Sequence, residues 1–87
     1  MLKFRFTCPR HQALFIEILR QEDCGDPVKM DEARRMLLSW LSEKYPLLVL
    51  EHFAHARCIA CEFEAAGLSL DDVVARLRDL ARELKDR

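Results

Sequence analysis

The sequence predicts an all-α protein, a compact bundle of about four helices with a short extended N-terminal segment. Apolar residues recur every three to four positions through most of the chain, which is the spacing of one face of a helix. Pro9 and Pro27 stand where helices can begin, because proline is favoured in the first turn. The composition, 51% hydrophobic and 33% charged, indicates a folded chain and not a disordered one.

Length and charge narrow the class of protein further. Eighty-seven residues predict one domain that spans residues 1–87. The net charge of −1 gives no general attraction to nucleic-acid phosphates. No run approaches the roughly 18 apolar residues of a membrane span, and the start of the chain lacks the apolar core of a secretory signal. We therefore expect a cytoplasmic protein that does not enter the membrane.

The first residues alternate between apolar and basic side chains, with Leu2, Phe4 and Phe6 on one side. This period of two predicts a strand, and a lone strand is not stable without a partner. Three arrangements follow from the pattern. Residues 2–6 could pair with a second chain in a homodimer, lie as an extended arm on the bundle, or pair with Leu47–Leu50. The last arrangement would make the fold α+β.

Two helices are predicted in the first half of the chain. The first runs from Pro9 to about Glu22, with Cys8 as its N-cap, and Gly25 in the following turn is a plausible terminator. The second begins after an Asp26 cap. It ends near Lys44, because Pro46 disfavours helical geometry at the residue before it.

The central element of the predicted bundle is one long helix from Leu47 to Ala66, ended by Gly67. Its apolar residues form two opposite faces, and a helix of that kind is normally buried between neighbours. Only a strip that includes Glu51, His55 and Glu62 is expected to face water. A last helix follows Ser69, which with Asp72 resembles a capping box. Its apolar face is formed by Val73, Val74, Leu77, Leu80, Ala81 and Leu84.

The sharpest chemical feature is a pair of short motifs, Cys8-x-x-His11 and Cys58-x-x-Cys61. Residues three apart on a helix project from the same face, so each motif can present two ligands together. Three thiolates and an imidazole can surround Zn²⁺ in a tetrahedron. We therefore predict that these four residues bind one structural zinc ion.

A zinc ion in this position would join the start of the first helix to the middle of the chain. In the chain-entropy model, closing a loop of about 50 residues stabilises a protein by roughly 4 kcal/mol. That is a large part of the roughly 5–15 kcal/mol that stabilises a small domain. Two other interpretations stay open: Cys58 and Cys61 could be buried small residues without chemistry, or they could form a thiol redox switch.

Two other residues are possible ligands. Cys24 could replace His11 and give a four-thiolate iron–sulfur site, and His55 could join Cys58 and Cys61. The His55-x-x-Cys58-x-x-Cys61 stretch partly resembles the zinc-containing anti-sigma factors, small helical domains with His-x-x-x-Cys-x-x-Cys on one helix. Ala54 stands where that family has its histidine, so the resemblance implies no function for this chain.

The preferred function is a non-enzymatic, regulatory module that acts through a protein partner. A catalytic zinc normally has three protein ligands and an open position, whereas four are offered here. The second possibility is a nucleic-acid-binding regulator, recognisable by binding that weakens steeply with salt. Its basic face would consist of Lys3, Arg5, Arg10, Arg34, Arg35 and Arg57. The third possibility is the thiol redox switch.

Overall fold

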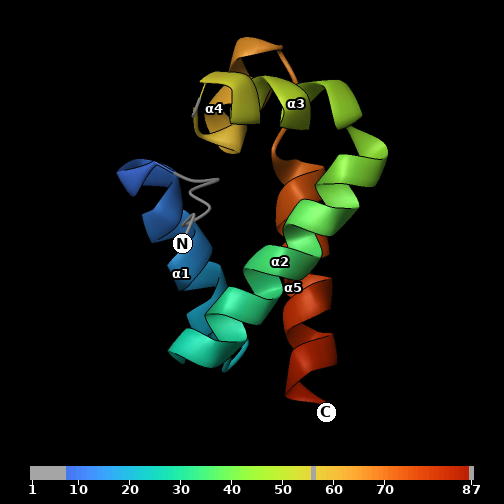
Figure 1. The fold of residues 1–87 in the computed structure, drawn as a ribbon. Helices are drawn as coiled ribbons and strands as arrows, with labels where there is room; N and C mark the ends of the chain where they lie inside the picture. Colours follow the sequence, from blue (N-terminus) through green and yellow to red (C-terminus); the bar gives the residue numbers. More distant parts are fainter. Residues whose placement is uncertain (1–7, 56, 87) are drawn as a thin grey trace.

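The computed structural model describes residues 8–55 and 57–86. These residues form five helices (Figure 1), namely α1 (Pro9–Gln21), α2 (Pro27–Lys44), α3 (Pro46–His55), α4 (Ile59–Ala65) and α5 (Asp71–Lys85). No strand occurs in these ranges, so the predicted all-α class is confirmed. The predicted extended segment at residues 2–6 lies outside the described residues.

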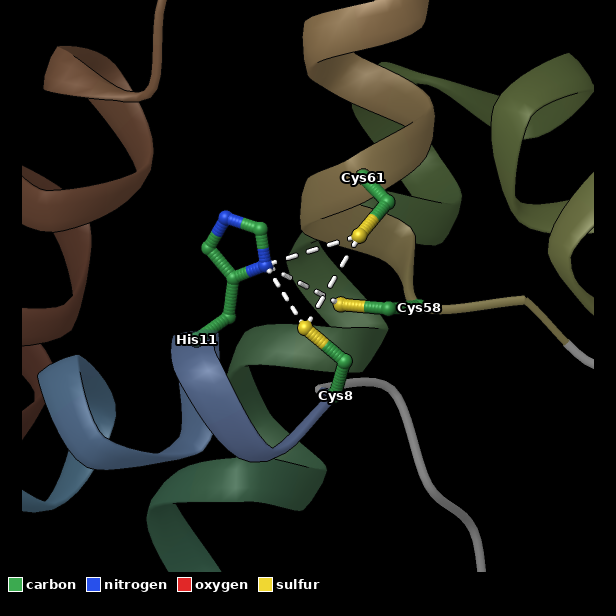
Figure 2. A group of neighbouring side chains, drawn as sticks. All are labelled: Cys8, His11, Cys58 and Cys61. Carbon is green, nitrogen blue, oxygen red and sulfur yellow. Dashed lines mark hydrogen bonds between the residues drawn. The ribbon is translucent and has the colours of Figure 1, made fainter.

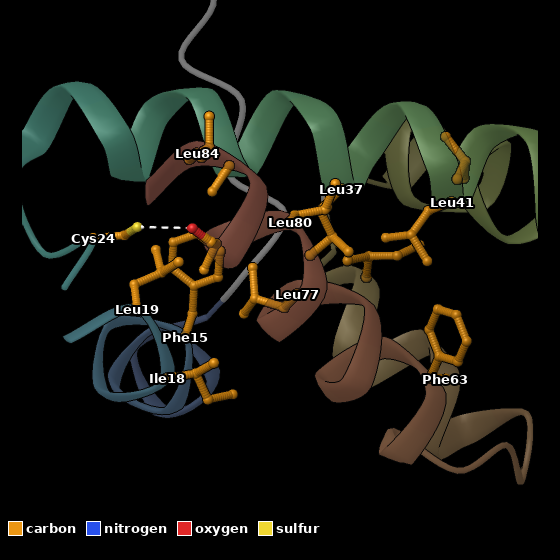
Figure 3. Close-up of a cluster of buried hydrophobic side chains, with 14 residues drawn as sticks. Phe15, Ile18, Leu19, Cys24, Leu37, Leu41, Phe63, Leu77, Leu80 and Leu84 are labelled. Carbon is orange, nitrogen blue, oxygen red and sulfur yellow. Dashed lines mark hydrogen bonds between the residues drawn. The ribbon is translucent and has the colours of Figure 1, made fainter. Parts of the chain in front are cut away.

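The helices form a bundle with a cap at one end. α5 packs against both α2 and α1, while α3 packs against α2 and α4. Figure 1 shows α3 and α4 lying together at the top, across the ends of the longer helices. The core between these elements (Figure 3) consists of Phe15, Ile18, Leu19, Cys24, Ala33, Leu37, Leu41, Val49, Ile59, Phe63, Leu77, Leu80, Ala81 and Leu84.

The predicted starts of the first two helices are present. Cys8 is the N-cap of α1 and Pro9 its first residue. At the start of α2, the Asp26 carboxylate accepts a hydrogen bond of 2.9 Å from the Lys29 backbone N–H, which satisfies one donor that the first turn leaves open. In the turn between the two helices it is Asp23, with φ of 59°, that takes the left-handed conformation, and not Gly25.

The single central helix was a wrong prediction, and the helix count is therefore five instead of about four. α3 ends at His55 and α4 starts at Ile59, with Cys58 extended between them at φ −67° and ψ 128°. Neither glycine nor proline marks this interruption in the sequence. Tertiary contacts override helix propensity here, because the extended Cys58 carries its sulfur toward α1.

The same region corrects two further expectations. Leu47–Leu50 lies within α3, so its pairing as a strand with residues 2–6 is excluded. Only one apolar side of this region is covered: Val49 is buried, whereas Leu47 is 79% exposed and Leu50 64% exposed. Glu62, expected to face water, is buried.

The start of the last helix also differs from the prediction. Leu70 is the N-cap of α5, and its side chain makes no capping hydrogen bond. The Ser69 hydroxyl accepts a hydrogen bond of 3.1 Å from the Asp71 backbone N–H. Ser69 therefore stabilises the turn that leads into α5, and the predicted capping box with Asp72 is not formed. Gly67 follows Ala66, the C-cap of α4, and so ends this helix as predicted, with a φ of 74° that favours glycine.

Candidate metal centre

The two cysteine motifs occupy equivalent places at the starts of two helices. Cys8 is the N-cap of α1, and Cys58 is the N-cap of α4. His11 and Cys61 follow in the first turn of each helix, so each motif directs two side chains to one side. Figure 2 shows the four side chains converging between α1 and α4.

The ligand atoms of these four residues lie within 4.8 Å of one another. The His11 Nδ1 atom is 3.6 Å from both the Cys58 and the Cys61 sulfur, and 3.1 Å from the Cys8 sulfur. The Cys61 and Cys8 sulfurs are 3.8 Å apart. Each of the four residues that the sequence singled out therefore belongs to one cluster that could hold a metal ion.

These separations can be compared with the edges of a zinc tetrahedron. With Zn–S near 2.3 Å and Zn–N near 2.0–2.1 Å, a regular tetrahedron places its sulfurs about 3.8 Å apart and its nitrogen about 3.6 Å from each sulfur. The Cys8–Cys61, His11–Cys58 and His11–Cys61 distances, 3.8, 3.6 and 3.6 Å, equal these edges. The Cys8–His11 pair, at 3.1 Å, would open by about 0.5 Å around an ion.

A carboxylate fixes which nitrogen of His11 faces the sulfurs. Glu64 Oε1 lies 2.7 Å from His11 Nε2. An ionised carboxylate only accepts hydrogen bonds, so Nε2 carries a proton and donates a hydrogen bond to Glu64. Nδ1 is then left with its lone pair directed at the three sulfurs, which is the state that a metal ligand needs.

Arg10 completes this polar group on the outer side of the cluster. Its Nη2 atom lies 3.0 Å from each oxygen of Glu64 and 3.2 Å from His11 Nε2. The hydrogen bonds from His11 and Arg10 lower the pKa of Glu64, so the carboxylate stays ionised. Arg10 and His11 belong to α1 and Glu64 to α4, so this group joins the same two helices as the cysteines.

The surroundings shift the pKa values of two of the thiols in opposite directions. Hydrogen bonding, chiefly from the His11 backbone, lowers the pKa of Cys8 to about 6. Burial, together with hydrogen bonding and charge from the neighbouring sulfurs, raises the pKa of Cys61 to about 12. A bound cation favours the thiolate form, so metal binding would release the proton of Cys61.

The two alternative ligands lie elsewhere. Cys24 is completely buried in the core, where its thiol donates a hydrogen bond of 3.2 Å to the Ala81 carbonyl (Figure 3). His55 is exposed on α3 and lies 2.9 Å from Glu51. Neither belongs to the cluster, so the four-thiolate arrangement with Cys24 and the set with His55 are not supported.

Sequence reasoning missed Glu64 and Arg10 as parts of the site. The sequence pattern did not single out Glu64, and Arg10 was considered only as one member of the predicted basic face. The available signal was their spacing, because Glu64 follows Cys61 by three positions and Arg10 precedes His11 by one. An acid three residues after a ligand on the same helix lies beside that ligand.

The fold and the cluster define a small all-α domain with three cysteines and one histidine gathered between two helix starts. Comparison of the chain with protein-family models, curated proteins and solved structures finds no match. Among the described residues, no helix is long and apolar enough to cross a membrane.

Proposed function

We propose that this protein is a non-enzymatic module in which one zinc ion, bound by Cys8, His11, Cys58 and Cys61, joins α1 to α4. The observation that carries the proposal is that three of the six ligand separations agree with the edges of a zinc tetrahedron, in a cluster whose ligand atoms all lie within 4.8 Å of one another. Three sulfurs and one nitrogen favour zinc over magnesium or calcium, which prefer oxygen ligands.

The number of ligands supports a structural role for the ion. Structural zinc sites are closed by four protein ligands, whereas catalytic sites keep a position for water or substrate. The cluster offers four ligands, and His11 is itself hydrogen-bonded to Glu64. We therefore propose no reaction for this site.

The outer face of α3 supports action through a protein partner. Leu47, Leu50 and Phe53 are 79%, 64% and 46% exposed, and their spacing of three makes each one the neighbour of the next on the helix surface. Exposed apolar side chains grouped in this way are typical of a protein-binding surface. Val49 and His52, on the other side of α3, are buried and attach the helix to the bundle.

The second possibility, a nucleic-acid-binding face, is less well supported because its arginines have acidic neighbours. Arg10 pairs with Glu64, and Arg57 pairs with Glu62. Arg34 and Arg35 both pair with Asp31. Lys3 and Arg5 lie outside the described residues. Ion pairs of this kind reduce the positive potential that would attract phosphates, so we prefer a protein partner.

Substituting Leu50→Glu tests the proposed surface of α3. We expect this variant no longer to cross-link to a partner that the intact protein captures, or no longer to self-associate in sedimentation experiments. The reason is that a charge replaces the central apolar side chain of the surface. Helicity and zinc content should not change, since Leu50 is mostly exposed. Val28→Glu is the matched control, because Val28 is 75% exposed near the start of α2. Equal binding by both variants would contradict the α3 surface.

A further inference from the structure

The proposed zinc site contains a side chain whose orientation must be held. The ring of His11 offers two nitrogens, and only Nδ1 faces the three sulfurs (Figure 2). The ring also borders a groove whose other lining residues are all apolar, Ile59 and Ala60 among them. The groove therefore supplies no polar partner that could fix the tautomer of the ring.

We infer that Glu64 is a positioning residue for the metal ligand His11, and that Arg10 acts by holding Glu64. This inference rests on the proposed zinc site and assigns roles to two residues that are not themselves ligands. The 2.7 Å contact between Glu64 Oε1 and His11 Nε2 fixes both the tautomer and the direction of the ring. A carboxylate that accepts the second N–H of a ligating histidine also makes the ligand more basic.

Arg10 can act on the His11 ring only through the carboxylate. Its side chain is 70% exposed, and its Nη2 atom lies 3.0 Å from both Glu64 oxygens. The same atom lies 3.2 Å from His11 Nε2. However, arginine only donates hydrogen bonds, and Nε2 already carries a proton. Arg10 and His11 are thus two donors that share one acceptor, and Glu64 is the residue through which Arg10 is coupled to the site.

The test compares the zinc dissociation constants of the intact chain, Glu64→Gln, Arg10→Ala and the double variant, measured by competition with a chromophoric zinc chelator. We expect Glu64→Gln to weaken zinc binding by about 10-fold or more, the range typical for such partners of a ligating histidine. Arg10→Ala should cause a smaller loss. Adding Arg10→Ala to Glu64→Gln should cause little further loss, because the hydrogen bonds of Arg10 to this site end on Glu64 and coupled residues are not additive.

A matched control separates positioning from a general structural effect. Glu22→Gln removes another carboxylate that joins two helices, since Glu22 at the end of α1 lies 3.3 Å from Arg82 of α5. Zinc affinity should not change in this variant. Equal affinities of Glu64→Gln and the intact chain, or equal losses in Glu64→Gln and Glu22→Gln, would overturn the inference.

Spectroscopy supplies a readout that a purely structural role would not change. The ¹⁵N shifts of His11 in the zinc-loaded chain should identify Nδ1 as the metal-bound nitrogen and Nε2 as protonated. Metal on Nε2 would overturn the inference, because that atom would then be unable to donate to Glu64. If the intact chain binds no zinc, the proposed function itself is wrong. If the intact chain binds zinc and Glu64→Gln binds it equally well, only the role of Glu64 is wrong.

Discussion

Removing the zinc ion is expected to lower the free energy of unfolding by about 4 kcal/mol, the value for losing a cross-link across a loop of about 50 residues. Cys8 and Cys61 are 53 positions apart, so the ion closes most of the chain into one loop. α1 and α4 are otherwise joined near the cluster by the contacts of Glu64 with His11 and with the exposed Arg10. Exposed ion pairs contribute at most about 1 kcal/mol.

Thermal unfolding followed by circular dichroism measures this effect. For a domain of this size, a loss of about 4 kcal/mol corresponds to a fall in Tm of roughly 15–30 °C. The comparison requires chelator-treated protein, the same protein after zinc is restored, and a magnesium-treated sample as control. Identical melting curves for the chelator-treated and zinc-restored samples would show that the ion does not stabilise the fold.

The second large effect is expected from Phe63→Ala, which should destabilise the fold by about 3–5 kcal/mol through the cavity it creates. Phe63 is 1% exposed and is one of the largest buried side chains. Its ring meets that of Tyr45 edge to face, with centroids 4.8 Å apart. Because Phe63 belongs to α4, this contact attaches the helix that carries Cys61 to the end of α2.

Phe53→Ala is the matched control for this prediction, since it removes the same side chain from a partly exposed place. Phe53 is 46% exposed on α3, so its loss should cost only about 1 kcal/mol while it weakens partner binding through α3. Urea unfolding of both variants measures the difference. Equal destabilisation by the two substitutions would contradict the assignment of Phe63 to the core and of Phe53 to the interaction surface.

Much of the fold could be predicted from local signals in the sequence. Pro9, with Cys8 before it, gives the start of α1, and the Asp26 cap gives the start of α2. These signals work because they act on the backbone of adjacent residues. The break between α3 and α4 could not be predicted in the same way, because it depends on contacts between Cys58 and residues far away in the sequence.

The candidate site, like the fold, has one part that could be predicted from local sequence and another part that could not. Its four ligands were predictable because cysteine and histidine are the residue types that bind zinc, and a spacing of three brings each pair together. The role of Glu64 depends on where α4 lies relative to α1, which local spacing does not determine. For the same reason Glu62 and Glu64 look alike in the sequence, although one is buried beside Arg57 and the other contacts His11.

The zinc content of protein purified without chelator or nickel resin tests the central claim most directly. Elemental analysis should find close to one zinc ion per chain. Cys58→Ser should lower this content, because it removes one of the four ligands. Cys24→Ser should leave it unchanged, because Cys24 is buried against the Ala81 carbonyl, away from the cluster. Intact protein without stoichiometric zinc, or equal zinc in the two variants, would contradict the proposed metal site.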